Sequence, residues 1–369
     1  METGDRTATE AAAANGLEGV EVAHTVLSDV DGERGRLVIA GHDVEALAGR
    51  VGFEDVCLML WDGRDPVPEE SARLRAALGE ARVRAFEAIP GLGGALEMKD
   101  AMDALRATVA HLSAPTDESE GRMLVTAAAA VFVAAWCRIH AGQSPLRPDP
   151  ASPHAADYLR MATGSGEHAA ALESYLVTVT EHGMNASTFA ARVVASTGSD
   201  LVSAVVAAIG ALKGPLHGGA PGLVLEMLDA VGAAEHAAAW LEAEVAAGRR
   251  IMGMGHRIYR VRDPRAAVLE QAVEALERAS APSSRLRLAR AVEKSAEELL
   301  AKRHPERALR ANVEFYTAVL LEAVGLPREA FTATFAVGRV AGWSAHVAEH
   351  RRVGRLIRPS SRYVGPRSP

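Results

Sequence analysis

Apolar residues recur along this chain with two spacings, and each spacing predicts a different kind of element. In residues 22–39, apolar and polar positions alternate on both sides of an Asp-Gly pair, which favours a short β-hairpin. Most later segments have apolar positions three or four residues apart, the spacing of amphipathic helices. Helices are predicted over 43–50, 53–61, 69–88, 99–113, 118–141, 153–163, 167–182, 185–197, 199–212, 221–231, 234–248, 263–280, 284–302, 312–325, 327–331 and 335–349. The pattern therefore indicates an all-α protein with one small hairpin.

Two of the predicted helices are apolar on every face. Residues 123–137 and 201–212 contain no charged side chain, so they fit only in the middle of a domain of many helices. The first is also shorter than the roughly 20 residues that a membrane span needs. Residues 234–311 are richer in Arg and Glu, as in the amphipathic helices of a smaller domain. The predicted organisation is a flexible leader over 1–20, a large helical domain over 21–218 and 313–369, and a small helical domain over 219–312.

Composition and charge narrow the class of protein. Of the 369 residues, 49% are hydrophobic and 4% aromatic, which suits a large core of closely packed helices. The net charge of -7 argues against a nucleic-acid partner, because binding phosphates needs an extended basic surface. Cys57 and Cys137 lie in apolar runs and are expected to be buried, reduced thiols of a cytoplasmic protein. Small molecules, and neither nucleic acid nor membrane, are the expected partners.

Three histidines lie beside glycines in separate predicted loops. They are His182 in EHGMN, His217 in GPLHGG and His256 in GMGHR. A single histidine of this kind is most often an ordinary loop residue. Three of them, each following a helical segment, indicate a shared site that performs acid-base chemistry.

A carboxylate and several arginines are candidates for the same site. Asn312 is a predicted N-cap, and Glu314 falls in the following first helical turn, where the helix dipole would keep it ionised at neutral pH. Arg339 has apolar residues on nearly every side and is expected to be buried, where a guanidinium needs an anion. Arg265 and Arg358 are further candidates for binding carboxylates. The alternative for each residue is an ordinary first-turn or surface charge.

Taken together, several segments resemble the signature segments of the citrate synthase family. These are GPLHGGA, GMGHRIYRVRDPRA, NVEFY and FAVGRVAGWSAH, in this order, with EHGMNAST and DAMDALRATVAHL as further similar segments. The similarity extends from about residue 20 to the end. It implies an all-α fold with a large and a small domain, and an acyltransferase of the tricarboxylic acid cycle that condenses acetyl-CoA with oxaloacetate.

The resemblance also implies roles for individual residues. His217 would hydrogen-bond the thioester oxygen of acetyl-CoA, His256 would polarise the ketone of oxaloacetate, and Glu314 would remove the methyl proton. It implies a homodimer, no metal, and no cofactor other than acetyl-CoA as a substrate. The implied binding residues are His182, Asn185, Arg265 and Arg339 for oxaloacetate, Arg358 for oxaloacetate in the neighbouring subunit, and Arg257, Arg260 and Arg262 for the CoA phosphates.

Glu314 departs from the family pattern, which usually has Asp at this position. The side chain is one methylene longer, and an error of about 1 Å in placing a base can be costly. A non-catalytic relative that binds CoA or a carboxylate is therefore an alternative, although the histidines and arginines are retained. Another is 2-methylcitrate synthase, which uses propionyl-CoA, because a single methylene is discriminated only weakly.

Two further motifs are expected to be accidental. His346, Glu349 and His350 match H-x-x-E-H of a zinc peptidase class, but no Asp, Glu, His or Cys follows as a third ligand. An exposed terminal helix is predicted there instead. Residues 164–169 fit G-x-G-x-x-A, but no strand precedes them, which disfavours a dinucleotide site.

Overall fold

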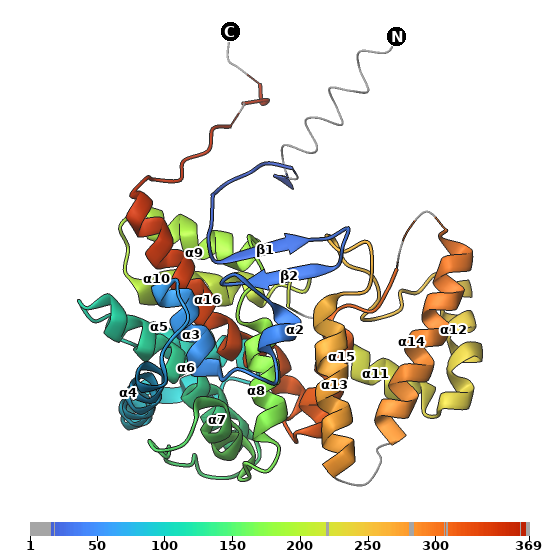
Figure 1. Ribbon diagram of the computed structural model, residues 1–369, viewed down its shortest axis with the longest axis horizontal. Helices are drawn as coiled ribbons and strands as arrows, with labels where there is room; N and C mark the ends of the chain where they lie inside the picture. Colours follow the sequence, from blue (N-terminus) through green and yellow to red (C-terminus); the bar gives the residue numbers. More distant parts are fainter. Residues whose placement is uncertain are drawn as a thin grey trace.

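The computed structural model consists of helices and one small sheet (Figure 1). The expected leader over residues 1–20 lies almost entirely outside the described residues. The structure describes residues 16–17, 19–218, 221–279, 284–305, 307, 309–361 and 363–366.

The predicted hairpin is present near the N-terminus. Strand β1 (Ser28–Asp31) pairs antiparallel with β2 (Arg36–Ile39), so that the Asp-Gly pair begins the turn. Leu37 and Ile39 alternate with more exposed neighbours and are fully buried, which anchors the hairpin to the helices below. A two-residue third strand, β3 (His42–Asp43), extends the sheet and was not predicted.

The helices follow the predicted ones in order, with two differences in number: a 3-10 segment, η1, is additional, and the helix predicted over 234–248 is divided into a 3-10 segment, η2, and helix α12. The all-α prediction is therefore confirmed. Their bounds are α2 Val44–Leu47, α3 Phe53–Asp62, α4 Pro68–Glu87, η1 Ile89–Glu97, α5 Ala101–Ala110, α6 Glu118–His140, α7 His154–Thr163, α8 Ala169–Val179, α9 Ala186–Ser196, α10 Leu201–Leu212, α11 Pro221–Val231, η2 Ala234–His236, α12 Ala237–Ala246, α13 Pro264–Ala279, α14 Ser284–Arg303, α15 Val313–Ala323, η3 Arg328–Ala330 and α16 Phe331–Val353.

Helices α6 and α16 form the centre of the larger group of helices. Residues 127–130 of α6 are all alanine and fully buried, because small side chains let neighbouring helices approach closely. Within the described residues, α6 has the length and hydropathy of a membrane span, but 72% of its apolar window is buried inside the protein. It is a core helix, as its sequence predicted.

The prediction of an exposed helix near His346 is wrong. Helix α16 is buried over most of its length, with His346 at 0% and Glu349 at 8% exposure. The His346 ring lies between the side chains of Arg192 and Glu181, at 2.9 and 3.0 Å. These contacts come from α9 and from the loop after α8, which local sequence could not reveal.

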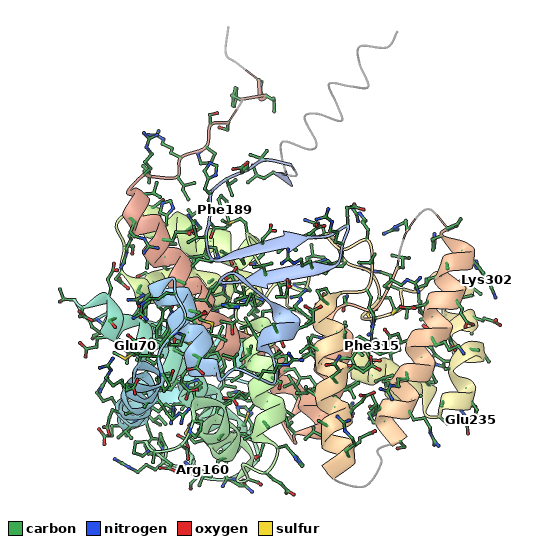
Figure 2. All side chains as sticks on the ribbon, in the orientation of Figure 1. Glu70, Arg160, Phe189, Glu235, Lys302 and Phe315 are labelled. Atoms are coloured by element: carbon green, nitrogen blue, oxygen red, sulfur yellow. The ribbon has the colours of Figure 1, made fainter. Side chains whose placement is uncertain are left out.

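The charged segment predicted as a small domain forms helices α11 to α14 on one side of the molecule (right in Figure 1). Helix α13 packs against α15 and α8, and α12 packs against α14. Phe315 of α15, labelled in Figure 2, is fully buried near this junction. The loop that carries His182 lies in the chain between α8 and α9, and the loop that carries His256 lies between α12 and α13.

Candidate active site

Two of the three predicted histidines face each other. The rings of His182, after α8, and His256, after α12, meet edge to face with centroids 5.6 Å apart. Tyr259 lies against both rings, and its hydroxyl is 3.1 Å from Nε2 of His182. A tyrosine thus joins the two loops.

Backbone contacts determine which nitrogen of His256 carries a proton. Its Nδ1 accepts hydrogen bonds from the backbone N–H groups of Ile258 and Tyr259, at 3.1 and 3.2 Å. We therefore assign the proton to Nε2. This atom lies 3.5 Å from Nη2 of Arg265, which is also a donor. Two donors directed at one region favour an acceptor oxygen of a ligand between them.

His217 has the opposite tautomer. Its Nε2 accepts the backbone N–H of Ser187 at 3.3 Å and lies 2.8 Å from the Ser187 hydroxyl. The indole N–H of Trp343 in α16 donates to the same hydroxyl at 3.1 Å. The proton of His217 is therefore assigned to Nδ1, which is left to donate to a ligand.

All three histidines are neutral at physiological pH. Burial, reinforced by the charge of nearby arginines, lowers the pKa of His217 and of His256 to about 4. For His182 burial and the charges of Arg265 and Arg339 hold the pKa well below its usual value. Neutral imidazoles can donate hydrogen bonds to a carbonyl without adding charge to the site.

Arg265 is held rigidly at the start of α13. Its guanidinium makes two hydrogen bonds to Asp263, from Nε at 3.0 Å and from Nη2 at 2.7 Å, and both side chains are buried. Asp263 also accepts the backbone N–H of Val313 at 3.2 Å, which ties this pair to the start of α15. The ion pair therefore fixes a guanidinium beside His256.

Arg339 is buried as predicted and is incompletely paired. Its Nε donates to the carbonyl of Val179, and its guanidinium lies over Phe335 at 4.7 Å. Its Nη2 has no hydrogen-bond partner within the described part of the chain. Burial lowers the pKa of Arg339 to about 10, opposed by the charge of Glu181, so the group stays charged at neutral pH. A buried cation with an unused donor is suited to an anionic ligand.

Two glycines place the N-terminus of α15 in the site. Gly253 and Gly255 have φ values of +73° and +87°, which other residues rarely adopt. This backbone lets Gly253 accept from the Asn312 N–H at 3.0 Å, while Gly255 accepts from the Asn312 side chain at 2.9 Å. Asn312 in turn caps α15 by accepting the N–H of Glu314 at 3.0 Å. The predicted N-cap is confirmed.

Glu314 was expected to be fully ionised at neutral pH, but its pKa lies close to neutral pH. Burial raises the pKa of Glu314 to about 7, although the charge of Arg265 opposes the shift. Desolvation therefore outweighs the effect of the helix N-terminus. A carboxyl group with a pKa near 7 is matched to general base catalysis at neutral pH.

Some predicted site residues have other partners. Asn185 uses its amide oxygen to cap α9 at Thr188, and its amide nitrogen donates to Gly183, so the structure gives it a structural role. Arg262 is paired with Glu270 and Glu293 at 2.7 Å each, which leaves it poorly suited to binding a CoA phosphate. Arg257, Arg260 and Arg358 are exposed.

Tyr259, Asp263, Ser187 and Trp343 are part of the site but were not predicted. Each lies within three or four residues of a predicted residue in one of the signature segments. Their contacts with His182, Arg265 and His217 join different parts of the chain. From the sequence alone, only their closeness in the chain to predicted site residues could have indicated that these four residues belong to the site.

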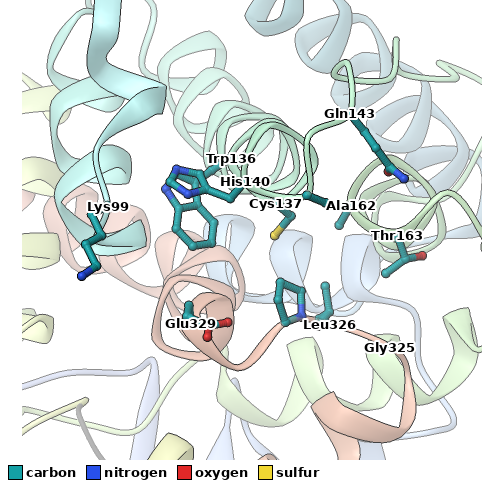
Figure 3. Close-up of a pocket in the computed structure, with 12 residues that line it drawn as sticks. Lys99, Trp136, Cys137, His140, Gln143, Ala162, Thr163, Gly325, Leu326 and Glu329 are labelled. Carbon is teal, nitrogen blue, oxygen red and sulfur yellow. The ribbon is translucent and has the colours of Figure 1, made fainter.

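A separate hollow of about 710 Å³ lies away from these histidines (Figure 3). It is lined by the end of α6, including Trp136 and Cys137, and by the loop before η3, including Leu326. The rings of Trp136 and His140 stack at 4.1 Å. None of the predicted site residues lines this hollow, so it is distinct from the candidate active site.

Comparisons with known sequences agree with the motifs. A family model for the citrate synthase C-terminal domain matches residues 16–360. The citrate synthase of Haloferax volcanii is 38% identical, with 95% of each chain covered. That of Deinococcus radiodurans is 35% identical, with 96% of each chain covered.

Solved structures of other proteins have a fold similar to that of this chain. The citrate synthase of Thermotoga maritima is similar with a TM-score of 0.83 and 36% identity, covering 96% of both chains. Thermoplasma acidophilum citrate synthase, in its ternary complex with carboxymethyl coenzyme A and oxaloacetate, is similar with a TM-score of 0.85 and 26% identity, covering 96% of this chain and 97% of that one. On these grounds, and on the motifs and the site, this chain belongs to the citrate synthase family.

Proposed function

We propose that this protein condenses acetyl-CoA with oxaloacetate and water to give citrate and CoA, and is thus an acyltransferase of the citrate synthase type. The observation that carries the proposal is Glu314, a partly buried carboxyl group with a pKa raised to about 7. It lies in the electrostatic field of Arg265, which also contacts His256. This combination supplies a base, a hydrogen-bond donor and a binding charge for an anionic substrate.

Oxaloacetate is proposed to bind between Arg339, Arg265 and His182. Within the part of the chain that the structure describes, Arg339 has an unused buried donor, Nη2, for a carboxylate. Arg265 and His256 direct two donors at one region, where an oxygen of the substrate is accommodated. Bidentate guanidinium contacts are the usual way of binding carboxylates.

The first chemical step removes a proton from acetyl-CoA. The carboxylate of Glu314 takes a proton from the methyl carbon, while Nδ1–H of His217 donates to the thioester oxygen. The methyl protons of a thioester are very weakly acidic, so the base is effective only if a donor stabilises the developing enolate. The neutral state of His217 suits this role.

The second step forms the carbon-carbon bond. The enolate carbon attacks the ketone of oxaloacetate, whose oxygen takes the Nε2 proton of His256 and becomes the hydroxyl of citryl-CoA. The proton that Glu314 removed in the first step balances this transfer when both residues return to their starting states. Water then cleaves the thioester and releases citrate and free CoA. These steps use only side chains of the chain and acetyl-CoA as a substrate, so we propose that activity needs no metal and no cofactor.

Acetyl-CoA is the proposed acyl donor. The relatives reported above carry the name citrate synthase, so the alternative of a 2-methylcitrate synthase is not favoured. Release of free CoA thiol with oxaloacetate should be faster with acetyl-CoA than with propionyl-CoA, and should persist in EDTA. Faster release with propionyl-CoA would contradict the proposed donor, and no release with either would contradict the proposed reaction.

We further propose that the protein is a cytoplasmic homodimer. The half-buried face of α9 includes the apolar residues Phe189, labelled in Figure 2, and Val193. Gly210 has open space beside it, which permits a close helix from a second copy. Cys57 and Cys137 are unpaired and buried, as expected of a reducing compartment.

The segment after α16 supports the same proposal. It leaves the body of the molecule (red, top of Figure 1), and its apolar residues Leu356 and Tyr363 are 57% and 63% exposed. Such residues are suited to docking on a partner subunit. In that arrangement Arg358 reaches the oxaloacetate of the neighbouring site.

Replacing Arg358 with alanine should raise the oxaloacetate KM by roughly tenfold or more, because a hydrogen bond to a charged group is lost. Arg352→Ala, which removes another exposed arginine near the end of α16, is the matched control and should leave KM unchanged. The mass in solution should be about twice the 38.8 kDa of the chain.

Co-expression tests whether Arg358 acts across the interface. Arg358→Ala and Glu314→Gln subunits are each impaired as homodimers. A mixed dimer contains one intact site only if Arg358 is contributed by the other subunit. Recovery of activity in purified mixed dimers is therefore expected, and no recovery would show that Arg358 does not act in the neighbouring site.

A further inference from the structure

The β1–β2 hairpin contacts both loops that carry the facing histidines. At one end, the hydroxyl of Ser28 donates to Oε1 of Glu181 at 3.0 Å and accepts the N–H of Gly183 at 3.0 Å. These two residues flank His182. One hydroxyl group thus joins the residues on either side of this histidine.

The turn of the same hairpin contacts the second loop. The carbonyl of Gly32 accepts the backbone N–H of Arg260 at 2.9 Å. A methyl group on Gly32 would overlap the carbonyl of Ile258, so the two backbones are in close contact. The N–H of Ile258 in turn donates to His256. A displacement of Ile258 therefore displaces the histidine that it orients.

Strand pairing and burial hold the two ends of β1 at a fixed distance from each other. Ser28 pairs with Ile39 and Asp31 with Arg36, so the whole length of β1 is in register with β2. Ile39 is fully buried and anchors the sheet. Val30, between the two contact points, packs closely on Gly183, where an added Cβ would lie 3.2 Å from Cγ2 of Val30.

We infer that the β1–β2 hairpin is a positioning element that sets the separation of His182 and His256, and thereby the geometry of the oxaloacetate site. Ser28 and Gly32 act through the histidine loops and do not touch the substrate. The inference rests on the proposed function, because it assigns oxaloacetate to these histidines. It is carried by the contacts at the two ends of one short strand.

Gly32→Ala tests the inference by displacing the loop at Ile258. Oxaloacetate binding, measured by calorimetry, is expected to weaken about tenfold or more, since an error of about 1 Å in a positioned group can change rates on the order of 10²-fold. The KM for oxaloacetate should rise with it, while that for acetyl-CoA changes little. Gly91→Ala is the matched control, because Gly91 is exposed with open space around it.

Ser28→Ala is the second variant, and it adds no atoms that could prevent folding. It releases the other end of the hairpin and should also weaken oxaloacetate binding, and a cooperative thermal melt checks that the variant is folded. Wild-type binding in either folded variant would overturn the positioning role. If the unaltered protein neither binds oxaloacetate nor releases thiol, the proposed function itself fails.

Discussion

Replacing Glu314 with glutamine is expected to lower kcat on the order of 10²- to 10⁴-fold, the usual contribution of a general base. Glutamine has nearly the same shape and leaves the cap from Asn312 to the Glu314 N–H in place. It cannot take up the methyl proton of acetyl-CoA. Thiol release at saturating substrates measures the effect, and calorimetry should show unchanged oxaloacetate binding.

Glu314→Asp is the matched control for this prediction. It keeps the carboxylate but withdraws it by one methylene from a backbone that is fixed by Asn312 and the two glycines. Activity between that of the unaltered protein and that of Glu314→Gln is therefore expected. If Glu314→Gln retained kcat within about threefold, which is far less than a general base contributes, Glu314 would not be the base.

The same carboxyl group should set the pH dependence. Because the base must be deprotonated and the pKa is about 7, kcat/KM should rise with pH and level off above about pH 7. His217 and His256, with pKa values of about 4, remain neutral throughout this range.

The folded-state pKa of Glu314 lies above its usual 4.5, so its contribution to stability is lost as pH rises through 7. Glu314→Gln should therefore raise the melting temperature at pH 8.

Replacing Arg339 with glutamine is expected to weaken oxaloacetate binding by about 2–5 kcal/mol, which is roughly 30- to 5000-fold in Kd. Nη2 has no partner among the described residues and the guanidinium is buried, so its charge is desolvated before the substrate arrives. Removal of such a charge need not destabilise the fold. Calorimetry with oxaloacetate and a thermal melt of the same sample separate the two effects.

Arg82→Gln provides the matched control, because Arg82 is equally buried but fully committed to structure. It pairs with Asp157 at 2.8 Å and donates to the carbonyls of Asp149 and Ser152. Its loss should lower the melting temperature and leave the oxaloacetate affinity unchanged. An Arg339→Gln protein that binds oxaloacetate as tightly as the unaltered one would remove Arg339 from the site.

Much of the molecule follows from local sequence. Apolar spacing predicted the helices because each helix is formed by residues close in the chain. The cap at Asn312 was predictable for the same reason, since an N-cap needs only its own helix. The apolar surroundings of Arg339 within α16 were enough to predict its burial. The order of the signature segments identified the family.

The state and partners of the site residues were decided by tertiary structure. Burial between elements far apart in sequence raised the pKa of Glu314, whereas the local helix dipole alone would have lowered it. Arg262 was drawn away from the site by carboxylates of α13 and α14. The contact of the Tyr259 hydroxyl with His182 exists only because folding brings their two loops together. The sequence by itself determined which groups are present and which helices carry them; desolvation and contacts across the chain determined their charge and their partners, because both depend on the packed neighbours and not on adjacent residues.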